Sequence, residues 1–529
     1  MEAACDTFYR IYKHGGRSDP INDILEQLDF HPLSITIFAT VAQHNQWNTN
    51  RLTMEWERQR TDVLRTQHSG SLATTIELSL ASPMFLELGP DARGALGVIA
   101  FFPQGVDEKN IDWLFPTVSD GPNIFDKFCV LSLTYRSNGF ITMLAPLRDY
   151  LRPKNPASSP LLGTTKERYF GRFSAYIYPD DPSFEESRWI TSEDANVEYL
   201  LDVFTTIDAN SNSVWDACID FMAHLYWHKS RLIVLGPKIE ALPDDHPSKA
   251  RCLNGLSWLF KSVGNWVEHK RLLTHTLKLW RERGDDQRVA LTLSYLSDAN
   301  RLMHLHKEGI QQAKEASEIF ERVGNTVKQA GCLLDLARAL YSDGQLDAAK
   351  EAASHAIGLI PEKGEQLQVC QGHRILGNIY RSKGETEKAI HHFEIALGNA
   401  SSLNWHDELF RVHYSLAEMF SGQGSFDDAR THVERVKSHA ANDPYLLAHA
   451  SGLQAWFWYK QHMFEKGRSE ALCALSMFEK LGAANDAEEI IQLLKQIDRN
   501  ARGVGVDAAT SDKSDENGEP VGTMLLVMC

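Results

Sequence analysis

Apolar residues in the C-terminal half of the chain recur with a constant step of 40 residues. One leucine marks each unit, and these leucines are Leu256, Leu296, Leu336, Leu376 and Leu416. A second marker lies eight residues further on, at Gly264, His304, Gly344, Gly384 and Gly424. Apolar residues on both sides of this second marker are three to four residues apart, which predicts two amphipathic helices joined by a tight turn.

The fourth unit shows the pattern most completely. Its defining residues are Leu376, Gly377, Tyr380, Gly384, Ala389, Phe393 and Ala396. Small residues stand where the two helices must approach closely, and large ones fill the space between neighbouring hairpins. We therefore expect an array of about six such units over residues 246–484, because a fixed period is typical of a solenoid, followed by a capping helix at 485–501.

These residues resemble the tetratricopeptide repeat, whose leucine, small residue, tyrosine, alanine, aromatic and alanine series appears in the fourth unit. The resemblance implies an all-α, right-handed superhelix whose first helices line a concave groove. It also implies a non-catalytic scaffold or sensor that binds a protein or peptide. The family's usual period is about 34 residues, so longer helices or connections are expected here.

The family's inward-facing positions can be transferred onto these units. They predict a peptide-binding groove formed by Asp298, Arg301, Arg338, Tyr341, Arg374, Asn378, Arg381, Tyr414 and Glu418. Four of these residues are arginines, whose guanidinium groups suit carboxylates, so an acidic peptide is the expected ligand. The alternative is that the arginines pair with neighbouring Asp and Glu residues of the chain.

A chaperone-associated adaptor is a further alternative. Arg374 and Asn378 resemble half of the carboxylate clamp found in chaperone-binding members of the family. Ser415, His449 and Leu453 stand where the other half would require asparagine, lysine and arginine.

The N-terminal part lacks the 40-residue repeat. We expect a helical region at 1–75, and a domain at 76–155 in which helices precede two strands at 130–134 and 139–143, as in a winged helix. Residues 156–190 are rich in Pro, Ser and Gly and predict a linker, and 191–245 predict a helical connector.

This part resembles the second half of the NB-ARC family, the nucleotide switch of NOD-like receptors and other STAND-type proteins. Residues 30–35, Phe-His-Pro-Leu-Ser-Ile, resemble its Gly-Leu-Pro-Leu-Ala-Leu motif, and residues 143–150 occupy the place of its Met-His-Asp motif, with Leu144 and Ala145 in place of the histidine and aspartate. Tetratricopeptide arrays follow such switches in receptors of filamentous fungi. The resemblance therefore suggests the C-terminal part of a fungal receptor of this kind, with roles in signal transduction and innate immunity.

The phosphate-binding half of that switch is absent, because no Gly-Lys-Ser/Thr loop occurs in the sequence. Either the chain begins inside a longer receptor, or it is a paralogue that has lost its catalytic core. The first case keeps a nucleotide-dependent switch open as an alternative function, whereas neither case gives this chain an ATPase activity of its own.

Composition and charge bear on nucleic-acid binding, metal sites and membrane association. The net charge of −16 disfavours nucleic-acid binding, and the 8 cysteines are scattered without a spacing suited to zinc, which indicates a reducing compartment. Without a signal peptide or an apolar run long enough for a bilayer, we expect a cytoplasmic protein with no membrane association. We further expect no enzyme activity, cofactor or metal, a homo-oligomer if the chain belongs to a receptor, and a disordered tail at 502–529.

Overall fold

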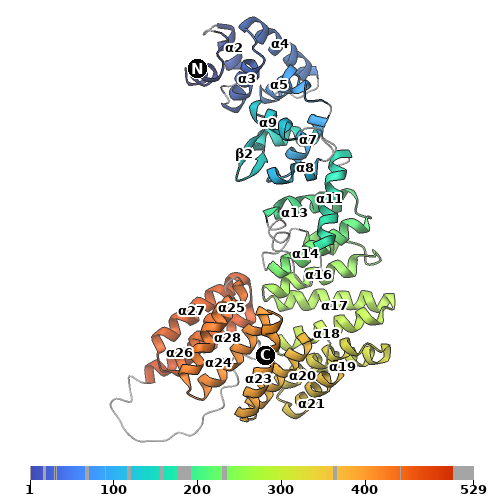
Figure 1. Cartoon of the computed structure of the whole chain (residues 1–529), viewed down its shortest axis with the longest axis vertical. Coiled ribbons are helices and arrows are strands. Elements are labelled where there is room, and N and C mark those ends of the chain that lie inside the picture. Colours follow the sequence, from blue (N-terminus) through green and yellow to red (C-terminus); the bar gives the residue numbers. More distant parts are fainter. Residues whose placement is uncertain are drawn as a thin grey trace. The chain divides into compact units, whose positions relative to one another are not determined.

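The computed structural model describes residues 2–15, 19–28, 30, 32–65, 71–89, 91–115, 121–154, 160–176, 192–228, 235–361, 366–440 and 443–503. The chain divides into two compact units, Met1–Asp220 and Phe221–Cys529, which are drawn in Figure 1. The predicted disordered tail lies outside the described residues from position 504 onward.

The first unit is mainly helical. Its helices are α1 (Glu2–Ile11), α2 (Asp19–Gln27), α3 (Pro32–His44), α4 (Thr49–Arg65), α5 (Ser71–Leu80), α6 (Pro83–Leu86), α7 (Asp91–Phe101), α8 (Ile111–Leu114), α9 (Gly121–Val130), α10 (Ala145–Leu151), α11 (Pro160–Tyr176) and α13 (Asp194–Ile207), with two short 3-10 helices, η1 (Glu108–Asn110) and η2 (Arg152–Lys154). Helix α14 (Asn212–His228) continues into the second unit. Pro32 is the first residue of α3, a position where its missing N–H costs nothing.

A small antiparallel sheet follows helix α7. Its strands are β1 (Val106–Asp107), β2 (Tyr135–Ser137) and β3 (Phe140–Thr142), in the spatial order β1-β3-β2. Val106 and Arg136 flank Ile141 in this sheet, and Ile141 is fully buried. The order along the chain is thus helix α7, strand β1, helices α8 and α9, and the β2–β3 hairpin.

The predicted strand at 130–134 was wrong. Val130 ends α9, and Leu131 and Leu133 enter the core from the turn that follows it. The strand itself is Tyr135–Ser137, whose three residues are exposed and therefore show no apolar alternation in the sequence.

The predicted linker at 156–190 was also wrong for residues 160–176, which form helix α11. Leu162, Thr165 and Tyr169 of this helix are buried. Tyr169 donates a hydrogen bond to Glu193 over 3.0 Å, and Asn196 of α13 donates to the same carboxylate over 2.6 Å. The spacing of these buried residues, rather than the proline content nearby, decides the local structure.

The second unit is an array of helical hairpins, so the predicted all-α repeat fold is confirmed. After the short helix α15 (Gly236–Ala241), the hairpins are α16 (Lys249–Ser262) with α17 (Trp266–Arg283), α18 (Asp286–Leu302) with α19 (His306–Val323), α20 (Thr326–Ser342) with α21 (Leu346–Leu359), α22 (Gln366–Ser382) with α23 (Thr386–Ser402), α24 (His406–Gly422) with α25 (Phe426–Ala440), and α26 (Pro444–Lys460) with α27 (Phe464–Leu481), followed by α28 (Ala484–Gly503).

The turn inside each hairpin uses the left-handed backbone region. Gly344, Gly384 and Gly424 have φ values of 78°, 74° and 79°. His304, which replaces the glycine in the second hairpin, keeps this conformation with φ 59°. The break in the glycine series is therefore accommodated without a change of turn, at a backbone cost that glycine avoids.

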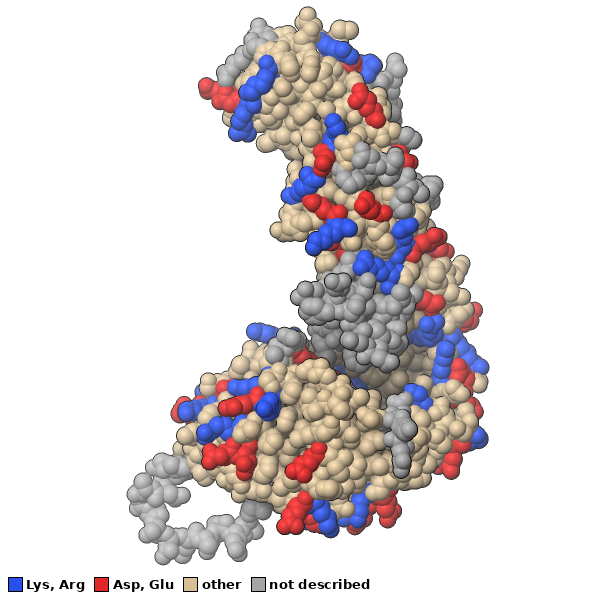
Figure 2. Space-filling view, viewed as in Figure 1, with Lys and Arg blue, Asp and Glu red and all other residues tan. Residues whose placement is uncertain are grey.

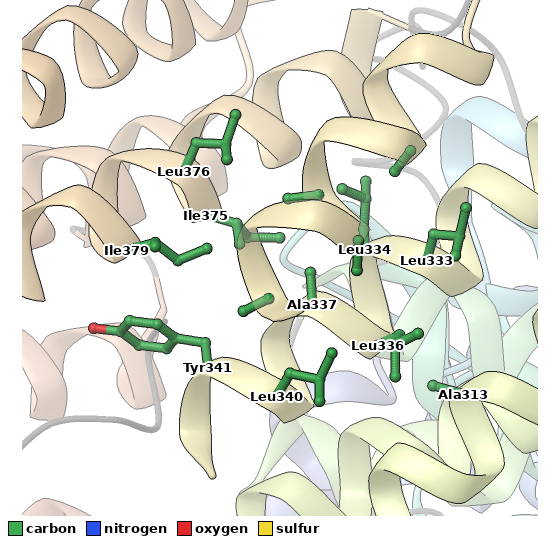
Figure 3. Close-up of a cluster of buried hydrophobic side chains, with 14 of the residues drawn as sticks. Ala313, Leu333, Leu334, Leu336, Ala337, Leu340, Tyr341, Ile375, Leu376 and Ile379 are labelled. Atoms are coloured by element: carbon green, nitrogen blue, oxygen red, sulfur yellow. The ribbon is translucent and has the colours of Figure 1, made fainter. Parts of the chain in front are cut away.

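Apolar side chains fill the space between successive hairpins. Figure 3 shows such a cluster, in which Leu334, Ala337 and Leu340 of α20 lie with Ile375 and Ile379 of α22. Alanines of α21 complete the cluster where the two helices of the third hairpin approach closely. The period of 40 residues thus places the same small and large residues at equivalent contacts.

Charged side chains of both signs are interspersed on the face of the two units seen in Figure 2. Within the described parts of the chain, no helix is both long and apolar enough to cross a membrane.

Gly377 tests the requirement for a small residue between the helices of a hairpin. A Cβ added there would lie 2.7 Å from the ring of Phe393, which is fully buried. Gly377→Ala should therefore lower the free energy of unfolding by about 1–3 kcal/mol, measured by urea denaturation. Gly398→Ala is the matched control, because a Cβ there meets no atom within 4 Å, and it should instead stabilise α23 by about 0.5–1 kcal/mol. Equal effects at the two positions would contradict the close approach.

Candidate functional site

The first helices of the hairpins carry the residues predicted for the groove. Successive first helices contact one another more extensively than successive second helices do. We call the surface formed by α16, α18, α20, α22, α24 and α26 the inner face. Asp298, Arg338, Asn378 and Glu418 occupy equivalent positions of the repeat and therefore share this face.

Two ion pairs join neighbouring repeats in the same way. Lys261 Nζ lies 2.9 Å from Asp298 Oδ2, and Arg381 Nη1 lies 2.6 Å from Glu418 Oε2. Both pairs link residues 37 positions apart, from the end of one first helix to the C-terminal part of the next. The repeat thus places a cation opposite a carboxylate at two junctions.

Arginines of α18 and α20 also pair with carboxylates of the array. Arg301 Nη2 donates to Asp298 Oδ1 over 2.9 Å. Arg338 pairs with Asp335 of its own helix, and Asp335 also accepts a hydrogen bond from Ser294. These carboxylates are supplied by the array itself, so no external anion is needed to neutralise the arginines.

Burial raises the pKa of these carboxylates, whereas the neighbouring cations lower it. Burial disfavours ionisation of Asp298, but Lys261, Arg301 and Arg338 outweigh it and hold its pKa well below the usual value. Burial dominates at Glu418 and raises its pKa in spite of Arg381. Burial likewise raises the pKa of Asp335.

Arg374 and Glu408 form a deeply buried ion pair on the inner face. Arg374 Nε donates to Glu408 Oε2 over 2.8 Å, and the two side chains are 1% and 3% exposed. Glu408 also attracts Arg338, two repeats away. The alternative in which Arg374 forms half of a carboxylate clamp is disfavoured, because Glu408 of the chain already pairs with its guanidinium group.

The prediction of an arginine groove for an acidic peptide needs the same correction. Arg301, Arg338, Arg374 and Arg381 do lie on the inner face, as the spacing predicts, but each pairs with an Asp or Glu of the array. The alternative of pairing within the chain therefore describes these four residues.

The three uncharged residues predicted for the groove have different surroundings. Tyr341 Oη lies 2.9 Å from Ser382 Oγ in the next repeat, and Tyr414 is buried in an apolar cluster with Phe410. Asn378 is 1% exposed, and neither its Nδ2 nor its Oδ1 has a hydrogen-bond partner among the residues that the structure describes. A buried amide without partners is costly, so Asn378 stands out from its neighbours.

A contact between the two ends of the array was not predicted. Trp266 and Leu302, beside the turns of the first two hairpins, cluster with Tyr445 of α26. Asn485 of α28 donates a hydrogen bond to the Leu302 carbonyl over 3.4 Å. We call this contact the closure joint, because residues from the two ends of the array meet there.

Titratable groups are buried in the closure joint. Tyr445 Oη donates to Asp486, and His449 Nε2 lies 3.4 Å from the same carboxylate. Burial raises the pKa of Asp486 to about 7 and that of Glu489 to about 8, the latter with repulsion from Asp486 and Glu418. Tyr445 and His449 are on α26, whereas Asp486 and Glu489 are on α28.

No protein-family model and no curated protein sequence matches the chain. Among solved structures, the chain is similar to a signal transduction ATPase with numerous domains (STAND) that has a tetratricopeptide repeat sensor, from Pyrococcus horikoshii (12% identity, 90% of this chain and 74% of that one, TM-score 0.47). It is also similar to a Rap protein crystallised with competence and sporulation factor (12% identity, 64% and 99%, TM-score 0.41) and to the quorum sensor NprR from B. thuringiensis (12% identity, 63% and 99%, TM-score 0.39). At these identities and scores, the likeness says nothing about function.

Glu489 predicts a pH dependence of the closure joint. Its pKa is about 8 in the folded chain and about 4.3 when unfolded, so the folded state holds the extra proton and stability falls as pH rises between these values. Glu489→Gln should therefore raise Tm at pH 8 relative to the unsubstituted chain and change it little at pH 5, measured by differential scanning calorimetry. Glu488→Gln, at the exposed neighbouring position, is the control and should shift Tm at neither pH. If Tm depended on pH in the same way for Glu489→Gln and the unsubstituted chain, the raised pKa of Glu489 would be refuted.

Proposed function

We propose that the chain is a non-catalytic sensor or scaffold in the cytoplasm, whose repeat array binds an extended peptide segment of a partner protein at the inner face. The observation that carries this proposal is the amide of Asn378. It supplies one hydrogen-bond donor group and one acceptor at the middle of the array, in a setting where every charged groove residue is already paired.

The chemistry of an amide favours a peptide main chain as the ligand. Each peptide group has one N–H donor and one C=O acceptor, which complement the Oδ1 and Nδ2 atoms of an asparagine. A ligand that made both bonds would recover the cost of burying this amide without partners. The arginine pairs beside it would then keep the first helices in place rather than contact the ligand.

This arrangement changes two earlier hypotheses about the ligand. A preference for acidic peptides is not part of the proposal, because the four arginines of the inner face are neutralised by the array. The adaptor for chaperone C-termini is not part of it either, since Arg374 is buried against Glu408.

The first unit supports a wider context for this sensor. Helix α7, strand β1, helices α8 and α9 and the β2–β3 hairpin follow the order of a winged helix, which agrees with the resemblance to the second half of an NB-ARC switch. We infer that the chain acts in a receptor of the NOD-like type, in which the array senses the ligand. Oligomerisation would then follow ligand binding.

The nucleotide half of such a switch can be sought directly. An in-frame Gly-Lys-Ser/Thr loop found by sequencing the 5′ end of the transcript would support a nucleotide-dependent receptor. A transcript that starts at Met1 would remove nucleotide from the proposal and leave the peptide-binding array.

Asn378 should behave as a ligand residue rather than a stabilising one. Asn378→Leu has nearly the same shape but no polar atoms, so it should raise the free energy of unfolding by about 1–2 kcal/mol in urea denaturation. A loss of 1 kcal/mol or more would mean that the amide already has a stabilising partner in the free protein.

The same variant tests binding. Random peptides displayed on phage would be selected on the full chain and their affinities measured by fluorescence anisotropy. Asn378→Leu should weaken the selected peptides by about 10-fold or more, equivalent to roughly 1.4 kcal/mol, while Gln311→Leu at an exposed position of the second helix α19 should not. Failure to select any peptide, or equal affinity for both variants, would contradict a peptide-binding inner face.

A further inference from the structure

Histidines face one another in pairs between the two helices of successive hairpins. His373 of α22 and His392 of α23 approach with 2.9 Å between their Nδ1 atoms, and His413 of α24 and His432 of α25 with 3.0 Å. The second pair lies 40 residues after the first at both positions, so the repeat itself reproduces the pair. Aromatic rings one repeat apart stack on them: Tyr380 on His392 and Phe420 on His432.

A third pair extends the row in the fifth hairpin. His406 and His439 have their Nδ1 atoms 3.2 Å apart, and the ring of His439 stacks on that of His413 with 5.7 Å between centroids. Four imidazoles of α24 and α25 therefore form a continuous row. Within the described parts of the chain, no group of three or more side chains has the geometry to hold a metal ion.

The geometry of these contacts limits how many protons each pair can hold. A hydrogen bond between two Nδ1 atoms needs one nitrogen with a proton and one without. When both rings are protonated, two N–H donors face each other and two positive charges lie about 3 Å apart, so the contact is lost and the charges repel.

The surrounding charges increase this repulsion. On α25, Arg435 disfavours a charge on His413, His432 and His439, while Asp428 favours one on His432. From α23, His391 acts on His373 and His392. Lys350 of α21 and Lys388 of α23 lie over the Tyr380 ring that stacks on His392. Of these groups only Asp428 is acidic.

We propose that the imidazole pairs form a proton-sensitive seam, through which mild acid loosens the fourth and fifth hairpins of the array. This property goes beyond ligand binding, but it acts on α22 and α24, the helices that carry Asn378 and Glu418. Acidification is thus expected to loosen the part of the inner face that α22 and α24 form.

The direction of the effect follows from the pKa shifts. Burial, together with neighbouring cationic groups, lowers the pKa of His392 and His413 to about 4, and that of His373, His432 and His439 also falls below the usual value. The unfolded chain binds protons at these residues near pH 6.5, before the folded chain does. Their contribution to stability is therefore present above about pH 6.5 and is lost as pH falls toward 4.

The test compares the full chain with His392→Phe/His432→Phe, which keeps a stacking ring in the first two pairs but removes one titrating group from each of these two. Tm is measured at pH 7.5 and pH 5.0 by differential scanning calorimetry, and hydrogen exchange of peptides from α22 to α25 is followed by mass spectrometry at both values after correction for the intrinsic rate. The acid-induced fall in Tm should be smaller in the double variant by about half, and its α22–α25 peptides should lose less protection.

Two further variants keep the result interpretable. His355→Phe, at an exposed position of α21, should show the same acid response as the unsubstituted chain. If the phenylalanine variant does not fold at pH 7.5, judged by circular dichroism, His392→Gln/His432→Gln keeps a polar partner without a charge and serves in its place. An unchanged acid response in the folded double variant, or full protection of α22–α25 at pH 5.0 in the unsubstituted chain, would overturn the proposal.

Discussion

Opposite charges buried between the first helices are the constraint on which the array depends. A guanidinium or a carboxylate taken out of water is costly unless a partner of opposite sign lies within hydrogen-bond distance. The pairs Lys261–Asp298, Arg374–Glu408 and Arg381–Glu418 meet this condition, and each links one repeat to the next. Register along the array is therefore set by these pairs as well as by apolar packing.

The two ends of the array that carries these charges are in contact with each other. The joint between Trp266, Leu302 and Tyr445 brings the first hairpins against the last. Several buried polar atoms of the first helices have no hydrogen-bond partner among the described residues. Asn378 has two such atoms, and its amide is therefore a place where the array has hydrogen bonds left to offer a ligand.

The sequence predicted the hairpins and the inner face because both follow from a fixed period. Leu376, Gly377 and Phe393 keep their roles in the packing. Pairing could not be predicted, since whether Arg374 faces solvent or Glu408 depends on how closely α22 and α24 pack. The closure joint was missed because its residues, such as Leu302 and Asn485, are far apart in the sequence. The exposed strand at 135–137 carries no apolar alternation and was missed for that reason.

A double-mutant cycle on Arg374 and Glu408 tests most directly whether charges on the inner face are buried and paired within the array. Arg374→Met alone should lower the free energy of unfolding by about 3–5 kcal/mol, because Glu408 is left buried without its partner, and Arg374→Met/Glu408→Leu should recover most of that loss. Arg281→Met, which breaks the exposed pair with Glu315, should cost less than about 1 kcal/mol. A cost for Arg374→Met as small as that of Arg281→Met would show that the Arg374–Glu408 pair is exposed to water and contradict the pairing of buried charges within the array.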